Sequence, residues 1–94
     1  MDLEWDSAKD AVNRRKHGIG FRQAAEIFRG PIMVSEDSRR DYGERRLIAL
    51  SEYDGDVIRV VFTERDSTIR IITAWKASQY DRTAYQQATK DRSL

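Results

Sequence analysis

Apolar residues recur along this chain with two periods, one typical of helices and one typical of strands. Near the start, a spacing of three and four residues predicts a helix over about 21–28, carried by Phe21, Ala24, Ala25 and Phe28. A thinner apolar stripe predicts an earlier helix that begins after Asp6 or Ser7 and ends at Gly18. Residues 3–5 alternate before it and indicate a short edge strand.

Four strands are predicted in the middle of the chain. Apolar and β-branched residues begin or fill the segments 32–34, 46–50, 57–63 and 69–75. An Asp-Gly pair at 54–55 predicts a tight hairpin between the second and the third. Strict alternation in the last strand puts one set of side chains on one face (Ile69, Ile71, Thr73, Trp75) and the next set on the other (Arg70, Ile72, Ala74, Lys76).

The end of the chain predicts one more helix, from about 78 to 89, and a tail from about 90 to 94 that frays. Strands joined by short turns pair antiparallel, and the two early helices need a sheet face to cover. The expected fold class is therefore α+β. Two N-terminal helices pack on a small antiparallel β-sheet that is followed by a C-terminal helix, in a single domain spanning 1–94.

The composition excludes several classes of function. The 94 residues include no cysteine, which removes disulfides, thiolate nucleophiles, zinc ribbons and iron–sulfur clusters. With His17 as the one histidine and no recognised spacing of carboxylates, we expect no metal site and no cofactor. No apolar run is long enough to span a bilayer and no signal peptide is visible, so we expect a cytoplasmic protein without a membrane partner.

The basic residues are mostly arginines, 13 of 17, although the formal net charge is only +1. The planar guanidinium suits a carboxylate or a phosphate. Arg46, Arg59 and Arg70 lie in predicted strands, and Arg65 lies at the turn between the two strongest. A sheet covered by helices on one face leaves the other open to a phosphate backbone. The alternative is that each arginine is a solvated position paired with a carboxylate.

Few residues are candidates for proton transfer. His17 precedes Gly18 at the end of a predicted helix, where a cation complements the helix dipole. If that helix end opens onto the arginine-bearing face, the imidazole becomes a candidate general acid or base. Glu44 and Glu64 are the alternative bases, and three aromatic residues are candidates for stacking on nucleotide bases (Trp75, Tyr80, Tyr85).

Short motifs in a fixed order make the sequence resemble the BrnT toxins of type II toxin–antitoxin systems, from Leu3 to about Tyr85. The motifs are Trp5-Asp6-Ser7-Ala8-Lys9, Asn13, Lys16-His17-Gly18-Ile19, Asp41-Tyr42-Gly43-Glu44-Arg45-Arg46, Thr63-Glu64-Arg65 and Ile69-Arg70-Ile71-Ile72-Thr73-Ala74. The resemblance implies a RelE-like fold and a ribonuclease that halts translation by cutting RNA. It also implies a BrnA-like antitoxin with a ribbon-helix-helix part, in a complex that binds operator DNA, with a dimer of toxin–antitoxin heterodimers as one arrangement.

One position departs from the family. Where the family often reads Ser-Ala-Arg, this chain has Thr73-Ala74-Trp75 and then Lys76. A cation is therefore missing or displaced by one residue, which on a strand means the opposite face. Either Lys76 takes over its role or the arginine-bearing face is weaker here.

Metal-free RNA cleavage needs a base for the ribose 2′-OH, charge stabilisation on the phosphoryl oxygens and an acid for the leaving 5′ oxygen. We expect Arg46 and Arg70 to clamp the scissile phosphate, with Arg65 in reserve. The expected base is His17 or Glu44, and the expected acid or second anchor is Tyr85 or Lys76. RNA-binding residues are then expected at Lys16, Arg65, Trp75 and Lys76.

This interpretation requires several guanidinium groups to converge on an open face of the sheet. If each is instead held by a neighbouring carboxylate, its physical basis is lost and only the family likeness remains. The competing hypotheses are a binding module that holds nucleic acid or protein without cleaving it, and a degenerate toxin that still binds its antitoxin.

Overall fold

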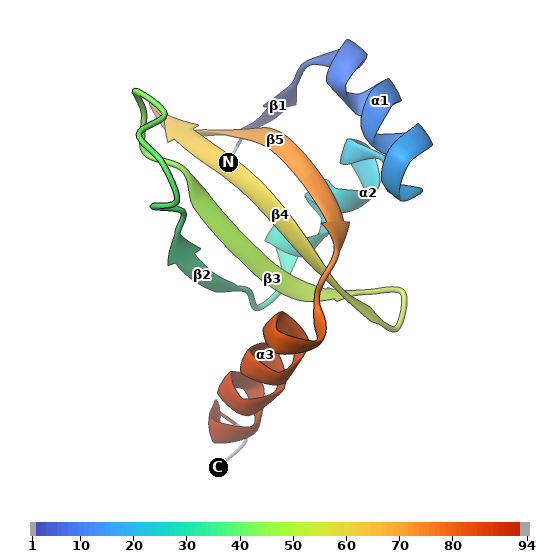
Figure 1. The fold of residues 1–94 in the computed structure, drawn as a ribbon, viewed down its shortest axis with the longest axis vertical. Coiled ribbons are helices and arrows are strands. Elements are labelled where there is room, and N and C mark those ends of the chain that lie inside the picture. Colours follow the sequence, from blue (N-terminus) through green and yellow to red (C-terminus); the bar gives the residue numbers. More distant parts are fainter. Residues whose placement is uncertain (1, 93–94) are drawn as a thin grey trace.

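The computed structural model describes residues 2–92, which form one five-stranded sheet and its helices (Figure 1). In chain order the elements are β1 (Asp2–Trp5), α1 (Ser7–His17), α2 (Phe21–Ala25), the 3-10 helix η1 (Glu26–Arg29), β2 (Met33–Glu36), β3 (Leu47–Tyr53), β4 (Asp56–Arg65), β5 (Thr68–Lys76) and α3 (Gln79–Arg92). The strand order across the sheet is β1-β5-β4-β3-β2. Among the described residues, no helix is long and apolar enough to cross a membrane.

The α+β class is confirmed, but the predicted arrangement needs three corrections. The sheet is mixed, because β1 precedes the helices and pairs parallel with β5, whereas the other strands pair antiparallel. The second predicted helix is divided into α2 and η1. The last helix continues to Arg92, beyond the predicted end at about 89, while 93–94 lie outside the described residues.

Local sequence signals set the boundaries of the first helix and of a hairpin. The Asp6 carboxylate accepts hydrogen bonds from two backbone N–H groups of the first turn at 2.8 and 3.0 Å, and these bonds lower the pKa of Asp6. Gly18 has φ +70° and donates its N–H to the Arg14 carbonyl at 2.9 Å, which ends α1 as predicted. The predicted turn at 54–55 joins β3 to β4 with positive φ at both residues.

The main core lies between the sheet and the helices α2 and η1. Its buried residues come from both layers and include Phe21, Ala24, Ala49, Val60, Phe62, Ile71 and Ala74.

The opposite face carries a smaller cluster of Leu50, Val57, Ala77 and Tyr85, with Met33 at its margin. On this opposite side α3 lies at only one end of the sheet (Figure 1). We therefore call this side the open face. By register it carries Arg46, Ile48 and Leu50, then Val57, Arg59, Val61 and Thr63, then Arg70, Thr73 and Trp75.

A β-bulge in β5 decides which residues reach the open face. Ile72 is the extra residue between the pairs that β5 makes with Val61 and Phe62 of β4. Beyond it the alternation is reversed relative to the prediction: Ala74 and Lys76 fall on the side covered by the N-terminal helices, and Thr73 and Trp75 fall on the open face with Arg70. The predicted sharing of one face by Arg70 and Lys76 is therefore wrong.

Asn13 of α1 binds the edge of β5 beyond the end of β1. Its Nδ2 donates to the carbonyls of Ala74 at 2.6 Å and Ile19 at 2.8 Å. Its Oδ1 accepts from Thr73 Oγ1 at 3.0 Å and from the Ala74 N–H at 3.3 Å. Asn13 thus replaces a neighbouring strand, and it fixes the C-terminal end of α1 beside the last residues of β5.

Candidate functional site

A row of polar residues crosses the open face at the end of the sheet away from α3. Thr63 of β4 lies opposite Arg70 of β5, and Arg70 lies opposite Glu4 of β1. Arg46, which directly precedes β3, continues the row on the other side of Thr63. Neighbouring strands are about 4.8 Å apart, so the backbones of Arg46 and Arg70 are separated by roughly 10 Å. Two arginine side chains can reach one phosphate across that distance.

Glu44 joins two of the predicted cations at this row. Its Oε2 accepts a hydrogen bond from Arg65 Nη2 at 3.0 Å, and its Oε1 lies 3.7 Å from Arg46 Nε. Glu44 belongs to the loop between β2 and β3, which the Thr63 hydroxyl holds against β4 by donating to the Arg45 carbonyl at 2.8 Å. The structure therefore brings together Glu44, Arg46 and Arg65, with Arg70 in the same row.

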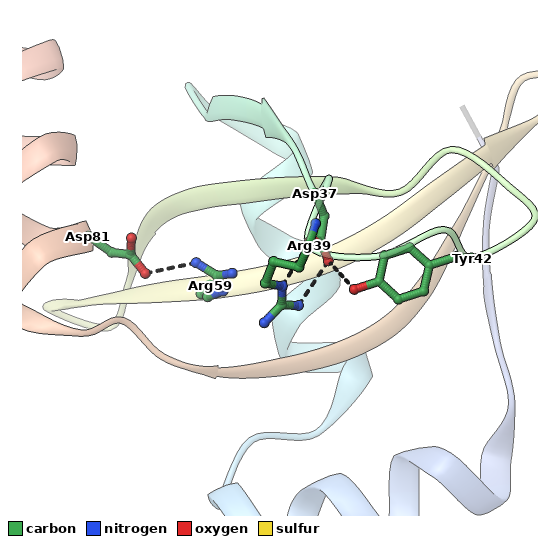
Figure 2. A network of polar contacts seen from close by, with 5 residues as sticks. All are labelled: Asp37, Arg39, Tyr42, Arg59 and Asp81. Atoms are coloured by element: carbon green, nitrogen blue, oxygen red, sulfur yellow. Dashed lines mark hydrogen bonds and ion pairs between the residues drawn. The ribbon is translucent and has the colours of Figure 1, made fainter.

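Asp37 is the buried carboxylate of this loop, with a side chain that is 0% exposed. It accepts hydrogen bonds from Arg39 Nε at 2.8 Å, from Arg39 Nη2 at 2.9 Å and from the Tyr42 hydroxyl at 3.2 Å (Figure 2). The Arg39 guanidinium, more than any other group, holds the pKa of Asp37 well below its usual range, and Asp37 raises the pKa of Arg39 in turn. Asp37 is therefore ionised at neutral pH.

The Tyr42 ring connects this carboxylate to the polar row. The Arg46 Cζ lies 4.0 Å from the centroid of the Tyr42 ring, and the Arg40 Cζ lies 5.9 Å from it. Sequence reasoning did not select Asp37, Arg39 or Tyr42 as site residues. The available signal was the motif at 41–46, which contains Tyr42, but no spacing in it indicates a contact with Asp37 or Arg46.

His17 lies in a second cluster, at the edge of β5 beyond the end of β1. Its ring centroid is 5.5 Å from that of Trp75, and the two rings line a shallow cavity of about 490 Å³ together with Lys16 and Lys76. Trp75 lies opposite Arg59, which is four residues along β4 from Thr63 and hence about 13 Å from the polar row. The structure therefore does not bring His17 to the row of Arg46 and Arg70.

Arg59 connects the second cluster to α3. Its Nη1 donates to Asp81 Oδ2 at 3.0 Å, in an ion pair that is mostly buried (Figure 2). Its Cζ lies 5.7 Å from the Trp75 ring centroid. The sequence predicted Arg59 to be one of the cations on the open face. In the structure its partner is Asp81 of α3.

The two residues expected to supply a proton or a second anchor lie elsewhere. Tyr85 belongs to α3, is 8% exposed and packs in the apolar cluster between α3 and the sheet. Lys76 falls on the other side of the sheet, as a consequence of the bulge, and its Nζ lies 3.7 Å from Asp56 Oδ2. Neither residue belongs to the polar row.

Carboxylates lie close to most of the predicted cations, so the expected set of unpaired guanidinium groups is not what the structure has. Within 4 Å the pairs are Arg46–Glu44, Arg65–Glu44, Arg70–Glu4 and Lys76–Asp56. The Arg70–Glu4 pair is 3.5 Å long and both side chains are exposed. Such pairs contribute about 0–1 kcal/mol, so a phosphate can replace the carboxylate at low cost. The predicted convergence of unpaired guanidinium groups is not observed: Arg46 and Arg70 share the polar row, but each lies beside its own carboxylate.

Over residues 2–92, no cluster of three or more His, Asp or Glu side chains has the geometry to ligate a metal ion. The chemistry open to the polar row is that of guanidinium groups, a carboxylate and a hydroxyl.

Comparison with known families gives one match. Residues 5–81 match the family described as "Ribonuclease toxin, BrnT, of type II toxin-antitoxin system", which confirms the resemblance seen in the motifs. No curated protein sequence matches the chain. The matched span contains Glu44, Arg46, Arg65 and Arg70 as well as the second cluster, and it ends before Tyr85.

Proposed function

The chain belongs to the family of BrnT ribonuclease toxins of type II toxin–antitoxin systems, and on that premise we propose that it cleaves RNA at the row of Arg46, Thr63 and Arg70. The two guanidinium groups bind the non-bridging oxygens of the scissile phosphate. Glu44 accepts the proton of the ribose 2′-OH, whose oxygen attacks phosphorus. The bond to the 5′ oxygen breaks, that oxygen takes a proton from water, and a 2′,3′-cyclic phosphate remains.

The observation that supports this proposal is that Arg46 and Arg70 lie in one row across the open face, with Glu44 3.7 Å from Arg46 Nε. Negative charge grows on the phosphoryl oxygens in the transition state, and one preorganised donor typically lowers such a barrier by about 3–4 kcal/mol. Arg65 holds Glu44 through Oε2 at 3.0 Å, which leaves Oε1 to accept the proton. Use of the 2′-OH as the nucleophile selects RNA over DNA, and the reaction as written needs no metal ion.

The second cluster is proposed to bind a flanking nucleotide. Trp75 offers an aromatic surface to a base, and Lys16 and Lys76 offer charges to the adjoining phosphates. His17 contacts Trp75, so in this proposal it orients the ring and does not act as the base. The distance of about 13 Å from the row suits a neighbouring nucleotide rather than the scissile one.

Membership of a type II family implies an antitoxin protein as partner. The finer proposal is a BrnA-like antitoxin with a ribbon-helix-helix part, a complex that binds operator DNA, and a dimer of heterodimers as one arrangement. A RelE-like classification of the fold and action on cytoplasmic RNA belong to the same proposal.

The test is cleavage of an RNA oligonucleotide by the purified chain and its variants. Arg46→Ala and Arg70→Ala should each reduce kcat/KM by roughly 100- to 1000-fold, because each removes one transition-state donor. His17→Ala should raise KM more than it lowers kcat. Arg22→Ala changes an exposed arginine of α2 and is the matched control. Full activity in both the Arg46 and the Arg70 variants would contradict the site assignment.

A second candidate function follows from the ion pairs. Since Arg46, Arg65 and Arg70 each face a carboxylate, the open face also suits a module that binds RNA or protein without cleaving it. The same assay separates the two, because only the nuclease leaves 2′,3′-cyclic phosphate ends. A degenerate toxin would bind its antitoxin but leave growth unaffected when produced alone.

A further inference from the structure

We infer that Tyr42 and Asp37 are positioning residues for Arg46: the Tyr42 ring holds the guanidinium in place, and Asp37 holds the ring. The inference rests on the proposed function, because it takes Arg46 to be a phosphate ligand. It adds two residues that act through Arg46 without touching the RNA.

The first step is that the Tyr42 ring stacks on the Arg46 guanidinium. The Cζ–centroid distance of 4.0 Å is well inside the range of a cation–π contact. The nearest carboxylate oxygen, on Glu44, is 3.7 Å from Nε and thus beyond a hydrogen bond. Over the described residues, the buried Nε of Arg46 has no hydrogen-bond partner. Stacking therefore orients this guanidinium.

The second step is that the ring is itself held by a buried anion. The Tyr42 hydroxyl donates to Asp37 Oδ2 at 3.2 Å, and Figure 2 shows Tyr42 and Arg39 both directed at the Asp37 carboxylate. The Asp37 N–H also donates to the Arg46 carbonyl at 2.9 Å. The two ends of the loop between β2 and β3 are thereby joined at the backbone, and Asp37 fixes both the ring and the strand end that carries Arg46.

The third step is that the restraint on Arg46 favours catalysis. A flexible arginine loses rotamer freedom when it binds a phosphate, whereas a stacked one has lost it beforehand. The Arg46 side chain is partly exposed, so its terminal nitrogens are accessible. The ring should therefore increase the rate of the chemical step, and Asp37 should act by keeping the ring where it is.

The experiment uses three variants of the full chain. Tyr42→Phe keeps the ring and removes the bond to Asp37, while Tyr42→Leu removes the ring. Tyr80, a base-stacking candidate from the sequence, is 83% exposed on α3 and belongs to neither the polar row nor the second cluster. Tyr80→Leu is therefore the matched control. We expect kcat to fall about tenfold in Tyr42→Leu, a size typical of a cation–π contact, to fall less in Tyr42→Phe and to stay unchanged in Tyr80→Leu, with KM nearly constant throughout.

A double-mutant cycle separates positioning from a general structural role. If the ring acts through Arg46, Tyr42→Leu should cost little further activity in an Arg46→Ala background. An equal loss in both backgrounds, or activity of Tyr42→Leu equal to that of Tyr80→Leu, would overturn the inference.

An independent readout does not require cleavage. The Nε–H resonance of Arg46, assigned by its loss in Arg46→Ala, should shift in Tyr42→Leu because the ring current disappears, and should change little in Tyr42→Phe. If the wild-type chain leaves no cyclic phosphate ends while this resonance responds as expected, the proposed function is wrong and the positioning contact stands. If the resonance does not respond to loss of the ring, the positioning contact is wrong whatever the activity.

Discussion

The apolar residues on the two faces of the sheet are shielded from solvent in different ways. On the helix-covered face, Phe21 of α2 and Val60 of β4 are 0% exposed and pack in a continuous apolar core. On the open face, Val61 is 1% exposed and Ile48 is 7% exposed, although α3 packs on Leu50 and Val57 at one end. Arg59 lies on this face and can cover apolar residues with its stem.

The difference teaches where stability and function separate in this chain. A change in the helix-covered core should reduce the free energy of unfolding and leave the chemistry of the folded fraction alone. A change in the polar row should alter RNA cleavage with a smaller effect on folding, because its ion pairs are exposed or partly exposed. The predictions below test that separation.

The largest effect is expected for Phe21→Ala. Removal of this fully buried ring leaves a cavity between α2 and the sheet and should lower the free energy of unfolding by about 3–5 kcal/mol. Urea unfolding followed by circular dichroism measures this loss, and kcat per folded molecule should not change. A loss below about 1 kcal/mol would show that the helix-covered core does not dominate the stability.

A smaller loss is expected for Asn13→Ala. The substitution leaves the N–H and carbonyl of Ala74 without partners at a buried strand edge, which should cost about 2–3 kcal/mol. The control is Val12→Ala, which changes an exposed neighbour on α1 and should stay within about 0.5 kcal/mol of the parent. Equal unfolding midpoints in the two variants would contradict the bridging role of Asn13.

Asp37→Asn should show a dependence on pH. The pKa of Asp37 is depressed in the folded chain, chiefly by Arg39, so its contribution to stability is present above the unfolded value near 3.9 and is lost as the pH falls toward the folded value. The variant should be less stable than the parent by about 1 kcal/mol at pH 7, a modest figure because Arg39 is exposed. The difference in unfolding midpoint between the variant and the parent, measured at pH 7, 5 and 3, should shrink only below about pH 4. A constant difference down to pH 3 would argue against an ionic role.

The smallest effect on stability is expected for Glu4→Gln. Its pair with Arg70 is exposed, so the free energy of unfolding should change by less than about 0.5 kcal/mol. Because Arg70 loses a competing carboxylate, the KM for RNA should fall. Steady-state kinetics at low salt measures this, with Glu26→Gln on η1 as a control for the charge change. An increase in KM would mean that Glu4 orients Arg70 instead of competing for it.

Much of the site was visible in the sequence because its residues lie close together along the chain or on paired strands. Glu44 and Arg46 belong to one motif, and Arg65 and Arg70 flank one turn, so hairpin geometry alone places them near one another. His17 was predicted as a base and is instead found beside Trp75, because the path of α1 depends on a contact between Asn13 and β5, 61 residues apart in the chain.

The sequence by itself determined the elements that depend on near neighbours: the end of α1 at Gly18, its start to within one residue (Asp6 or Ser7), and the hairpin at 54–55. Capping and positive φ are local properties. Only the tertiary structure decided the parallel pairing of β1 with β5 and the face on which Trp75 lies. Both depend on hydrogen bonds between distant segments, and a single extra residue in a ladder reverses every side chain beyond it.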